Sequence, residues 1–155
     1  MMPSIGSAAP EFSLPDQDGR VHSLKDYAGA PVLIYFYPKD DTPGCTKQAC
    51  MIRDAFPDFK KTGVTVLGIS TDSVKSHKKF AEKYGLPFTL LSDEEKKVVG
   101  AYGVWGRKKM MGREYDGVFR TSFLIGKDEN VLKVYENVKA DKHAEQVLAD
   151  LQVMA

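Results

Sequence analysis

The chain has 155 residues, 43% of them hydrophobic, and this length predicts one domain over residues 1–155 with a substantial core. Its 22 basic and 21 acidic residues leave a formal net charge of +1, which gives no electrostatic case for nucleic acid or a charged membrane. No stretch has the pattern of a signal peptide or the length of a transmembrane helix. We expect a cytoplasmic enzyme whose thiols are kept reduced, or one in an organelle if a transit peptide has been removed.

The apolar pattern predicts alternating strands and helices. Two short strands are expected between residues 12 and 24, around the Asp18-Gly19 turn, and a buried strand over 32–37. There follow a helix over 44–56, a strand over 64–70, a helix over 74–84, a strand over 88–91, a helix from a capping box at 92–95 to about 102, a hairpin of strands 118–125 and 131–135, and a helix from about 141. This order predicts an α/β fold, with a central mixed β-sheet flanked by helices and an N-terminal β-hairpin.

The most informative segment is Pro-Lys-Asp-Asp-Thr-Pro-Gly-Cys at residues 38–45, between the buried strand and the next helix. Thr42 suits the N-cap, Pro43 suits the first helical position, and Cys45 then falls in the first turn. Unpaired N–H groups and the positive end of the helix dipole favour a negative charge there. We therefore expect Cys45 to be an activated nucleophile, because the thiolate is the reactive form of cysteine.

The second cysteine, Cys50, lies five positions further along the same predicted helix. Residues five apart in an intact helix have Cα atoms about 8.6 Å apart, whereas a disulfide needs less than about 7 Å. The two cysteines therefore either never pair or pair after the first turns unwind. Cys45 shares a helix face with Ala49 and Ile52, so it should face a pocket inside the fold while Cys50 faces another environment. In an alternative interpretation, the two cysteines are only small, buried hydrophobic side chains without a redox role. Their spacing matches neither Cys-x-x-Cys nor a normal zinc site.

Pro38, Thr42 and Cys45 stand as Pro-x-x-x-Thr-x-x-Cys, which resembles the active-site signature of the peroxiredoxins. The run over residues 36–50 resembles their Q-type branch, also called bacterioferritin-comigratory proteins. The likeness covers nearly the whole chain, including residues 9–16, 68–72, 102–105, 109–112 and 120–125. The resemblance implies a thioredoxin-like fold and a thiol peroxidase that uses no metal, haem or flavin.

By this resemblance, the Cys45 thiolate attacks hydrogen peroxide or an organic hydroperoxide and becomes a sulfenic acid. Cys50 is the resolving cysteine, which condenses with that sulfenic acid to form an intrachain disulfide. Thioredoxin or a similar dithiol partner then reduces the disulfide. Because an intrachain bridge needs no second subunit, a monomer is expected.

The resemblance also implies roles for residues around Cys45. The Thr42 hydroxyl and the backbone N–H groups of Gly44 and Cys45 can donate hydrogen bonds to developing negative charge. Pro38 would form a rigid apolar wall. Arg120 matches the family's second active-site arginine, whose guanidinium would touch both thiolate and peroxide. Without the resemblance, the alternative is that Arg120 lies on a solvent-exposed face of its strand and has no role in the site.

Two positions depart from the usual pattern of the branch. Ser122 stands where threonine is frequent, and Gln48 stands where glutamate is common. Both residues keep the ability to form hydrogen bonds, so we expect altered tuning of the reaction rather than its loss.

Other conspicuous residues have plainer interpretations. His77 is expected to be a packed or half-buried side chain of its helix, whereas His22 and His143 are expected at the surface, and no spacing indicates a metal site. Trp105 is expected to pack in the core or a loop, or to lie beside the active-site pocket. The basic residues 107–109, with Arg113, are expected in a solvated loop.

Two other functions stay open from the residues. One is a thiol–disulfide oxidoreductase acting on proteins, against which the missing Cys-x-x-Cys argues. The other is a non-enzymatic, redox-linked chaperone that keeps the fold without the chemistry.

Overall fold

The computed structural model describes residues 1–154. In chain order its elements are β1 (Ser13–Pro15), β2 (Val21–Ser23), the 3₁₀ helix η1 (Leu24–Tyr27), β3 (Val32–Phe36), α1 (Pro43–Asp54), α2 (Phe56–Lys61), β4 (Thr65–Ser70), α3 (Val74–Tyr84), β5 (Thr89–Ser92), α4 (Lys97–Ala101), β6 (Trp105–Met110), β7 (Arg113–Val118), β8 (Thr121–Ile125), β9 (Val131–Tyr135) and α5 (His143–Met154). None of the helices in this range is long and apolar enough to cross a membrane.

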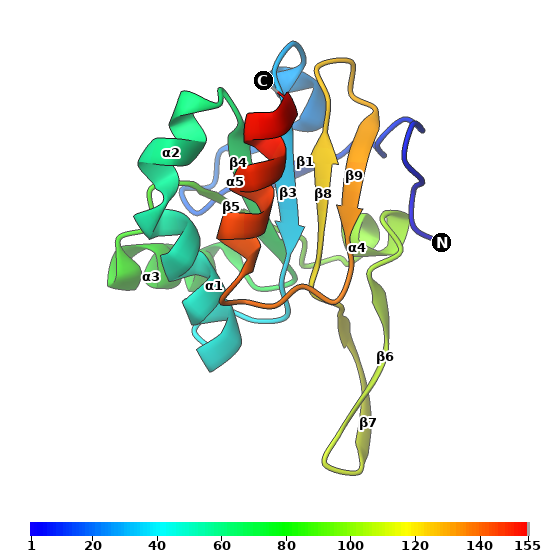
Figure 1. Cartoon of the computed structure of the whole chain (residues 1–155). Helices are drawn as coiled ribbons and strands as arrows, with labels where there is room; N and C mark the ends of the chain where they lie inside the picture. Colours follow the sequence, from blue (N-terminus) through cyan, green and yellow to red (C-terminus); the bar gives the residue numbers. More distant parts are fainter. Residues whose placement is uncertain (155) are drawn as a thin grey trace.

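The central sheet has the strand order β5-β4-β3-β8-β9, and β1–β2 and β6–β7 form two separate hairpins (Figure 1). Strand β3 pairs in parallel with β4 and antiparallel with β8, while β4–β5 is parallel and β8–β9 antiparallel. Every residue of β3 is buried, which is why its sequence is continuously apolar rather than alternating. The predicted mixed α/β sheet and N-terminal hairpin are therefore confirmed.

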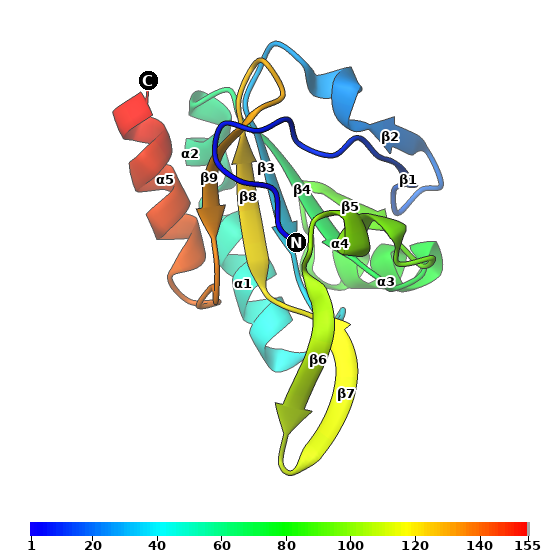
Figure 2. The same cartoon turned by 90° about the vertical axis from the view of Figure 1, so that its right-hand side faces the viewer.

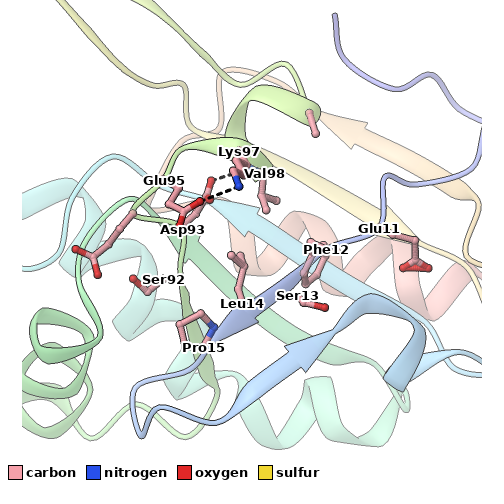
Figure 3. A pocket seen from close by; sticks show the side chains of 12 residues that line it. Glu11, Phe12, Ser13, Leu14, Pro15, Ser92, Asp93, Glu95, Lys97 and Val98 are labelled. Atoms are coloured by element: carbon pink, nitrogen blue, oxygen red, sulfur yellow. Dashed lines mark hydrogen bonds and ion pairs between the residues drawn. The ribbon is translucent and has the colours of Figure 1, made fainter.

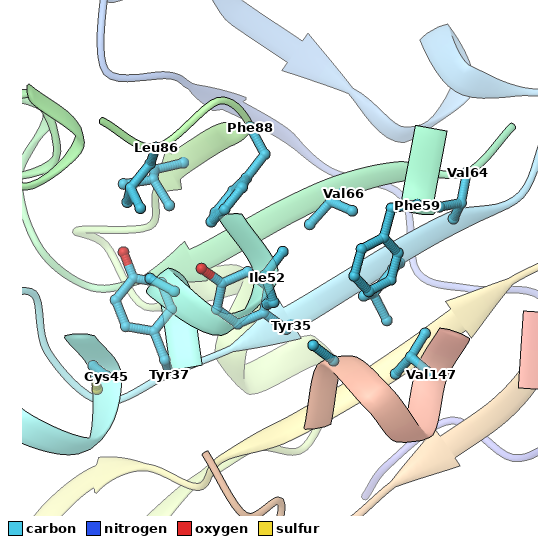
Figure 4. Packing of buried hydrophobic residues seen from close by; sticks show 14 of the residues in the cluster. Tyr35, Tyr37, Cys45, Ile52, Phe59, Val64, Val66, Leu86, Phe88 and Val147 are labelled. Carbon is cyan, nitrogen blue, oxygen red and sulfur yellow. The ribbon is translucent and has the colours of Figure 1, made fainter. Parts of the chain in front are cut away.

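The two faces of the sheet bury separate hydrophobic clusters. Leu33 and Tyr35 of β3 point to one face, where α1, α2 and α5 supply the covering side chains (Figures 1 and 4). Ile34 and Phe36 point to the other face, which α4 and the β1–β2 hairpin cover (Figure 2). Cys45 belongs to the first cluster, so the N-terminal turn of α1 lies against the core.

Two predicted helix boundaries are corrected. The expected helix over 44–56 ends at Asp54, and a second short helix, α2, begins at Phe56 with Pro57 in its first turn. Proline is tolerated there because the first N–H groups of a helix have no intrahelical partner. The expected capping box at 92–95 is wrong, because α4 begins only at Lys97. The buried Asp93 carboxylate instead accepts hydrogen bonds from backbone N–H groups of α4.

The predicted hairpin of strands 118–125 and 131–135 is confirmed as β8 and β9, except that β8 begins only at Thr121. The predicted basic loop at 107–109 is wrong. Residues 107–109 lie in β6, which pairs with β7 in a hairpin that projects from the body (Figures 1 and 2). Its two turn residues, Met111 and Gly112, have φ of 51° and 80°, as a two-residue hairpin turn requires. The chain leaves β7 at Val118 and enters β8 at Thr121, so Arg120 lies in the short connection between them.

The histidines also differ from expectation. His77 is fully buried, as predicted, and His22 is partly exposed beside Asp16. His143 is buried, against prediction, and its Nε2 lies 2.8 Å from the Ser122 hydroxyl. Burial, together with the positive charge of Arg120, lowers the pKa of His143 to about 4.

This burial predicts a loss of stability in acid. The unfolded chain protonates His143 near pH 6.5 and the folded chain only near pH 4. The unfolded state therefore binds more protons in this window, and stability falls as the pH drops through it. Between pH 7 and pH 5, His143 should account for about 2 kcal/mol of lost unfolding free energy. Urea unfolding at both pH values should show a smaller loss for His143→Gln, and an equal loss in both proteins would contradict the assignment.

Gly68 in β4 gives a second stability prediction. A Cβ added there would lie 2.8 Å from Tyr35 Cζ and 2.9 Å from Leu90 Cδ2. Gly68→Ala should therefore lower the unfolding free energy by about 1–3 kcal/mol, because the buried ring must move. Gly100→Ala is the matched control, because that position in α4 is exposed with nothing within 4 Å of a new Cβ. Urea unfolding should show no loss of stability in the control.

Candidate active site

A cavity of about 520 Å³ lies between the start of α1 with the loop before it, the connection from β7 to β8, and the β6–β7 hairpin. It brings together five of the six residues to which the sequence assigns a role in the site, namely Pro38, Thr42, Gly44, Cys45 and Arg120. These residues come from two parts of the chain about 75 positions apart. The antiparallel pairing of β3 with β8 brings those parts together.

Helix α1 places the two cysteines in different environments. Cys45 is the third residue of the helix and its side chain is only 2% exposed, whereas Cys50 is half-buried and does not line the cavity. Both are free thiols. The predicted orientation of the helix is confirmed, because Ala49 and Ile52 are completely buried on the same side as Cys45.

Arg120 is held between two side chains of α1. Its Nη2 donates to Cys45 Sγ at 3.4 Å, and its Nη1 donates to the Oε1 atom of Gln48. Gly44 allows this close approach, because a Cβ there would lie 3.0 Å from Nη2. Gln48 is completely buried but uncharged, so it orients the guanidinium without neutralising its charge.

Thr42 occupies the N-cap position of α1, as predicted, but its side chain does not cap the helix. Its hydroxyl donates instead to the carbonyl oxygen of Lys39 at 2.8 Å. The hydroxyl hydrogen is therefore engaged, and the oxygen lone pairs of Thr42 are left to accept a hydrogen bond. This corrects the expectation that Thr42 acts as a donor in the site.

A buried polar network fixes the loop before α1. The carboxylate of Asp40 accepts from Tyr37 Oη at 2.6 Å and Ser76 Oγ at 2.8 Å, and it lies 2.7 Å from His77 Nδ1. The backbone N–H of Asp40 donates to the carboxylate of Asp72 at 2.9 Å. One ligand atom from each of Asp40, Asp72 and His77 lies within 4.8 Å of the others, a spacing that a metal ion could use. Since hydrogen bonds already engage these groups, we assign them to anchoring the loop on α3 and the end of β4.

The hairpin contributes cavity residues that the sequence did not reveal. Lys108, Met110, Tyr115 and Gly117 lie on one face of β6–β7 and border the cavity opposite Cys45. Trp105 lies beside the cavity, one of the two places expected for it. The sequence does offer one signal for the hairpin, the glycine at 112, which lies between two segments rich in charged residues. No pattern in the sequence of the hairpin indicates that its residues border the cavity that contains Cys45.

A second hollow, of about 460 Å³, lies between β1 and α4 on the opposite face of the sheet (Figure 3). Its buried carboxylate, Asp93, is already engaged as the cap of α4. Its other acidic residues, among them Glu94 and Glu95, are exposed. Since no cysteine borders this hollow, the thiol chemistry belongs to the Cys45 cavity.

Comparison with known proteins agrees with this assignment. Residues 5–134 match the model of the AhpC/TSA family. The chain is 53% identical over 143 residues to peroxiredoxin Bcp of Escherichia coli K12, which covers 92% of each chain. It is 42% identical over 151 residues to peroxiredoxin Bcp of Bacillus subtilis, which covers 97% of this chain and 96% of that one.

Solved structures agree as well. PrxQ of Xylella fastidiosa superposes with a TM-score of 0.93 at 34% identity, covering 99% of this chain and 98% of its own. The bacterioferritin comigratory protein of Xanthomonas campestris gives a TM-score of 0.90 at 35% identity, covering 97% and 99%. These likenesses confirm the expected thioredoxin-like fold. With family model, relatives and fold in agreement, the chain belongs to the AhpC/TSA family, as a peroxiredoxin of the Bcp and PrxQ type.

Proposed function

We propose that the protein is a thiol peroxidase in which Cys45 reduces hydrogen peroxide and organic hydroperoxides. The observation that carries this proposal is the 3.4 Å contact between Arg120 Nη2 and the buried Cys45 sulfur at the edge of an open cavity. A guanidinium in that position stabilises a thiolate, which is the nucleophilic form of cysteine. The sulfur attacks the terminal oxygen of the peroxide, the O–O bond breaks, and Cys45 becomes a sulfenic acid.

Each neighbouring group has a role that its position allows. Arg120 and the backbone N–H groups of Gly44 and Cys45 would donate to the peroxide oxygens as negative charge develops. The Thr42 hydroxyl, which donates to the Lys39 carbonyl, would accept a hydrogen bond from the O–H of the peroxide. Pro38 would close one side of the cavity without adding a competing N–H group.

Cys50 is the proposed resolving cysteine, and its attack requires the start of α1 to unwind. Residues five apart in an intact helix have Cα atoms about 8.6 Å apart, beyond the range of a disulfide. Conversion of the Cys45 thiolate to a neutral sulfenic acid removes the negative charge that faces Arg120. This weakens the contact between Arg120 and the first turns of α1, so oxidation itself favours the opening that Cys50 needs.

Recycling then requires an external thiol reductant, for which we propose thioredoxin or a similar dithiol protein. We further propose that one chain, as a single domain over residues 1–155, completes the cycle as a monomer, because both cysteines lie on the same helix. Since Cys45 must be a free thiol at the start of each turnover, a reducing compartment such as the cytoplasm is the proposed location.

The cavity wall supports organic hydroperoxides as substrates. Trp105, Met110, Tyr115 and Val118 present apolar or aromatic side chains to the cavity that contains Cys45. Such a wall can bury the hydrocarbon part of an alkyl hydroperoxide. Alkyl peroxide reduction is also the activity described for the Xanthomonas campestris relative.

The division of roles between the cysteines predicts distinct products. One equivalent of hydrogen peroxide should remove two hydrogens from the intact mass of the reduced protein and link Cys45 to Cys50. Cys50→Ser should consume one equivalent and then stop, because the sulfenic acid has no resolving partner. Cys45→Ser should consume no hydrogen peroxide, because it lacks the proposed nucleophile. Intact-mass and peptide mapping measure these outcomes, and sustained thioredoxin-linked turnover by Cys50→Ser would contradict the proposed resolution.

Gly44 tests the approach of Arg120 to Cys45. In Gly44→Ala the new Cβ would lie 3.0 Å from Arg120 Nη2, so the guanidinium must shift and its contact with Cys45 is disturbed. We expect the rate constant for reaction with peroxide to fall at least about 10-fold, while stability is unchanged or raised because alanine favours the helix. Stopped-flow kinetics and urea unfolding measure the two effects. Gly100→Ala is the control, and an unchanged rate in Gly44→Ala would rule out this role.

A further inference from the structure

Three cationic residues border the Cys45 cavity, namely Arg120, the exposed Lys39 and the half-buried Lys108, and the cycle described above gives Lys108 no role. Lys108 lies in β6, and its side chain is half-buried. Its Nζ donates a hydrogen bond to the Val118 carbonyl oxygen at 2.9 Å and lies 6.0 Å from the centroid of the Tyr115 ring. These contacts hold the ammonium group against the cavity wall instead of leaving it free in solvent.

Gly117 leaves the space that lets the Lys108 side chain reach the Val118 carbonyl oxygen. A Cβ added to Gly117 would lie 3.0 Å from Lys108 Cδ, so the stem of Lys108 passes over a position without a side chain. The stem is thereby directed toward Val118, two residues before Arg120. Because an ammonium has three N–H groups and one of them binds the Val118 carbonyl, two are left for a molecule in the cavity.

The electrostatic surroundings favour release of a proton from Lys108. Burial lowers its pKa, the positive charge of Arg120 lowers it further, and the negative charge of Cys45 acts in the opposite direction. Asp116 also borders the cavity, but its carboxylate faces Arg107 at 3.7 Å. Arg120 cannot serve as a proton donor, since a guanidinium does not deprotonate in proteins.

We propose that Lys108 is the general acid that protonates the oxygen leaving from the peroxide. This inference rests on the peroxidase function proposed for Cys45. When the sulfur attacks the terminal oxygen, an S–O bond forms, the O–O bond breaks, and the departing oxygen keeps the electron pair as alkoxide or hydroxide. Lys108 transfers one proton to it, which releases an alcohol or water, and the neutral amine then takes a proton from solvent.

The test compares two peroxides of equal carbon count with different leaving groups. Ethyl hydroperoxide releases ethoxide, a strong base that needs a proton, whereas peracetic acid releases acetate, which leaves without one. Lys108→Gln should slow the reaction with ethyl hydroperoxide about 100-fold, within the usual range for loss of a general acid. Its reaction with peracetic acid should stay within about threefold of the unsubstituted protein, because that step has no proton to supply.

Three further measurements make the result specific. Lys108→Arg keeps the positive charge but not the transferable proton, so it should show the same selective loss as Lys108→Gln. Lys109→Gln, on the exposed opposite face of β6, should react normally with both peroxides. Alkylation of Cys45 by an uncharged reagent should proceed at a similar rate in the unsubstituted protein and Lys108→Arg, which checks that the site is folded and the thiolate is present.

The outcomes separate this inference from the proposed function. Equal slowing of both peroxides in Lys108→Gln and Lys108→Arg, or no slowing of either, would overturn the assignment of Lys108 as general acid. Failure of the unsubstituted protein to react with both peroxides would instead overturn the peroxidase function itself.

Discussion

Arg120 lies with its guanidinium between the sulfur of Cys45 and the amide of Gln48, and both of those residues belong to helix α1. A half-buried positive charge is costly unless a negative partner compensates it. Within residues 1–154, no carboxylate forms an ion pair with Arg120. The charge is therefore best compensated when Cys45 is a thiolate, so the same contact would prepare the proposed nucleophile and also holds the start of the helix.

In the proposed cycle, helix α1 must hold Cys45 in the cavity and must also let its first turns unwind. Its middle is anchored in the core by Ala49 and Ile52, both completely buried. Its first turn is held by the packing of Cys45 in the core, by the hydrogen bond from the Thr46 backbone N–H to the Thr42 carbonyl, and by the contact of Cys45 with Arg120. Local unfolding takes place where few buried contacts must be broken. In the proposed cycle, oxidation of Cys45 weakens its contact with Arg120, and the first turns then open toward Cys50 while the buried middle of the helix keeps its packing.

The β6–β7 hairpin completes the cavity from the other side. It extends beyond the central sheet (Figures 1 and 2), so most of its residues are exposed, although residues from each of its two faces border the cavity. Apolar side chains of the hairpin border the same cavity as Lys108, so the proposed hydrocarbon-binding wall lies beside the proposed proton donor. The chain enters β8 directly after the hairpin, and Arg120 lies in that connection. The position of the hairpin and the position of Arg120 are therefore linked through one short segment.

The local sequence was sufficient to place the central strand, the start of α1 and the opposite orientations of Cys45 and Cys50, because apolar periodicity and helix-capping chemistry act within a few residues. It also indicated the family, through the motif at residues 38–45 and further likeness over nearly the whole chain. Only the tertiary structure decided the position of Arg120, the burial of His143 and the turn of Lys108 toward the cavity. Each of these depends on pairing between strands or on packing between distant segments, and neither leaves a signal in the neighbouring residues.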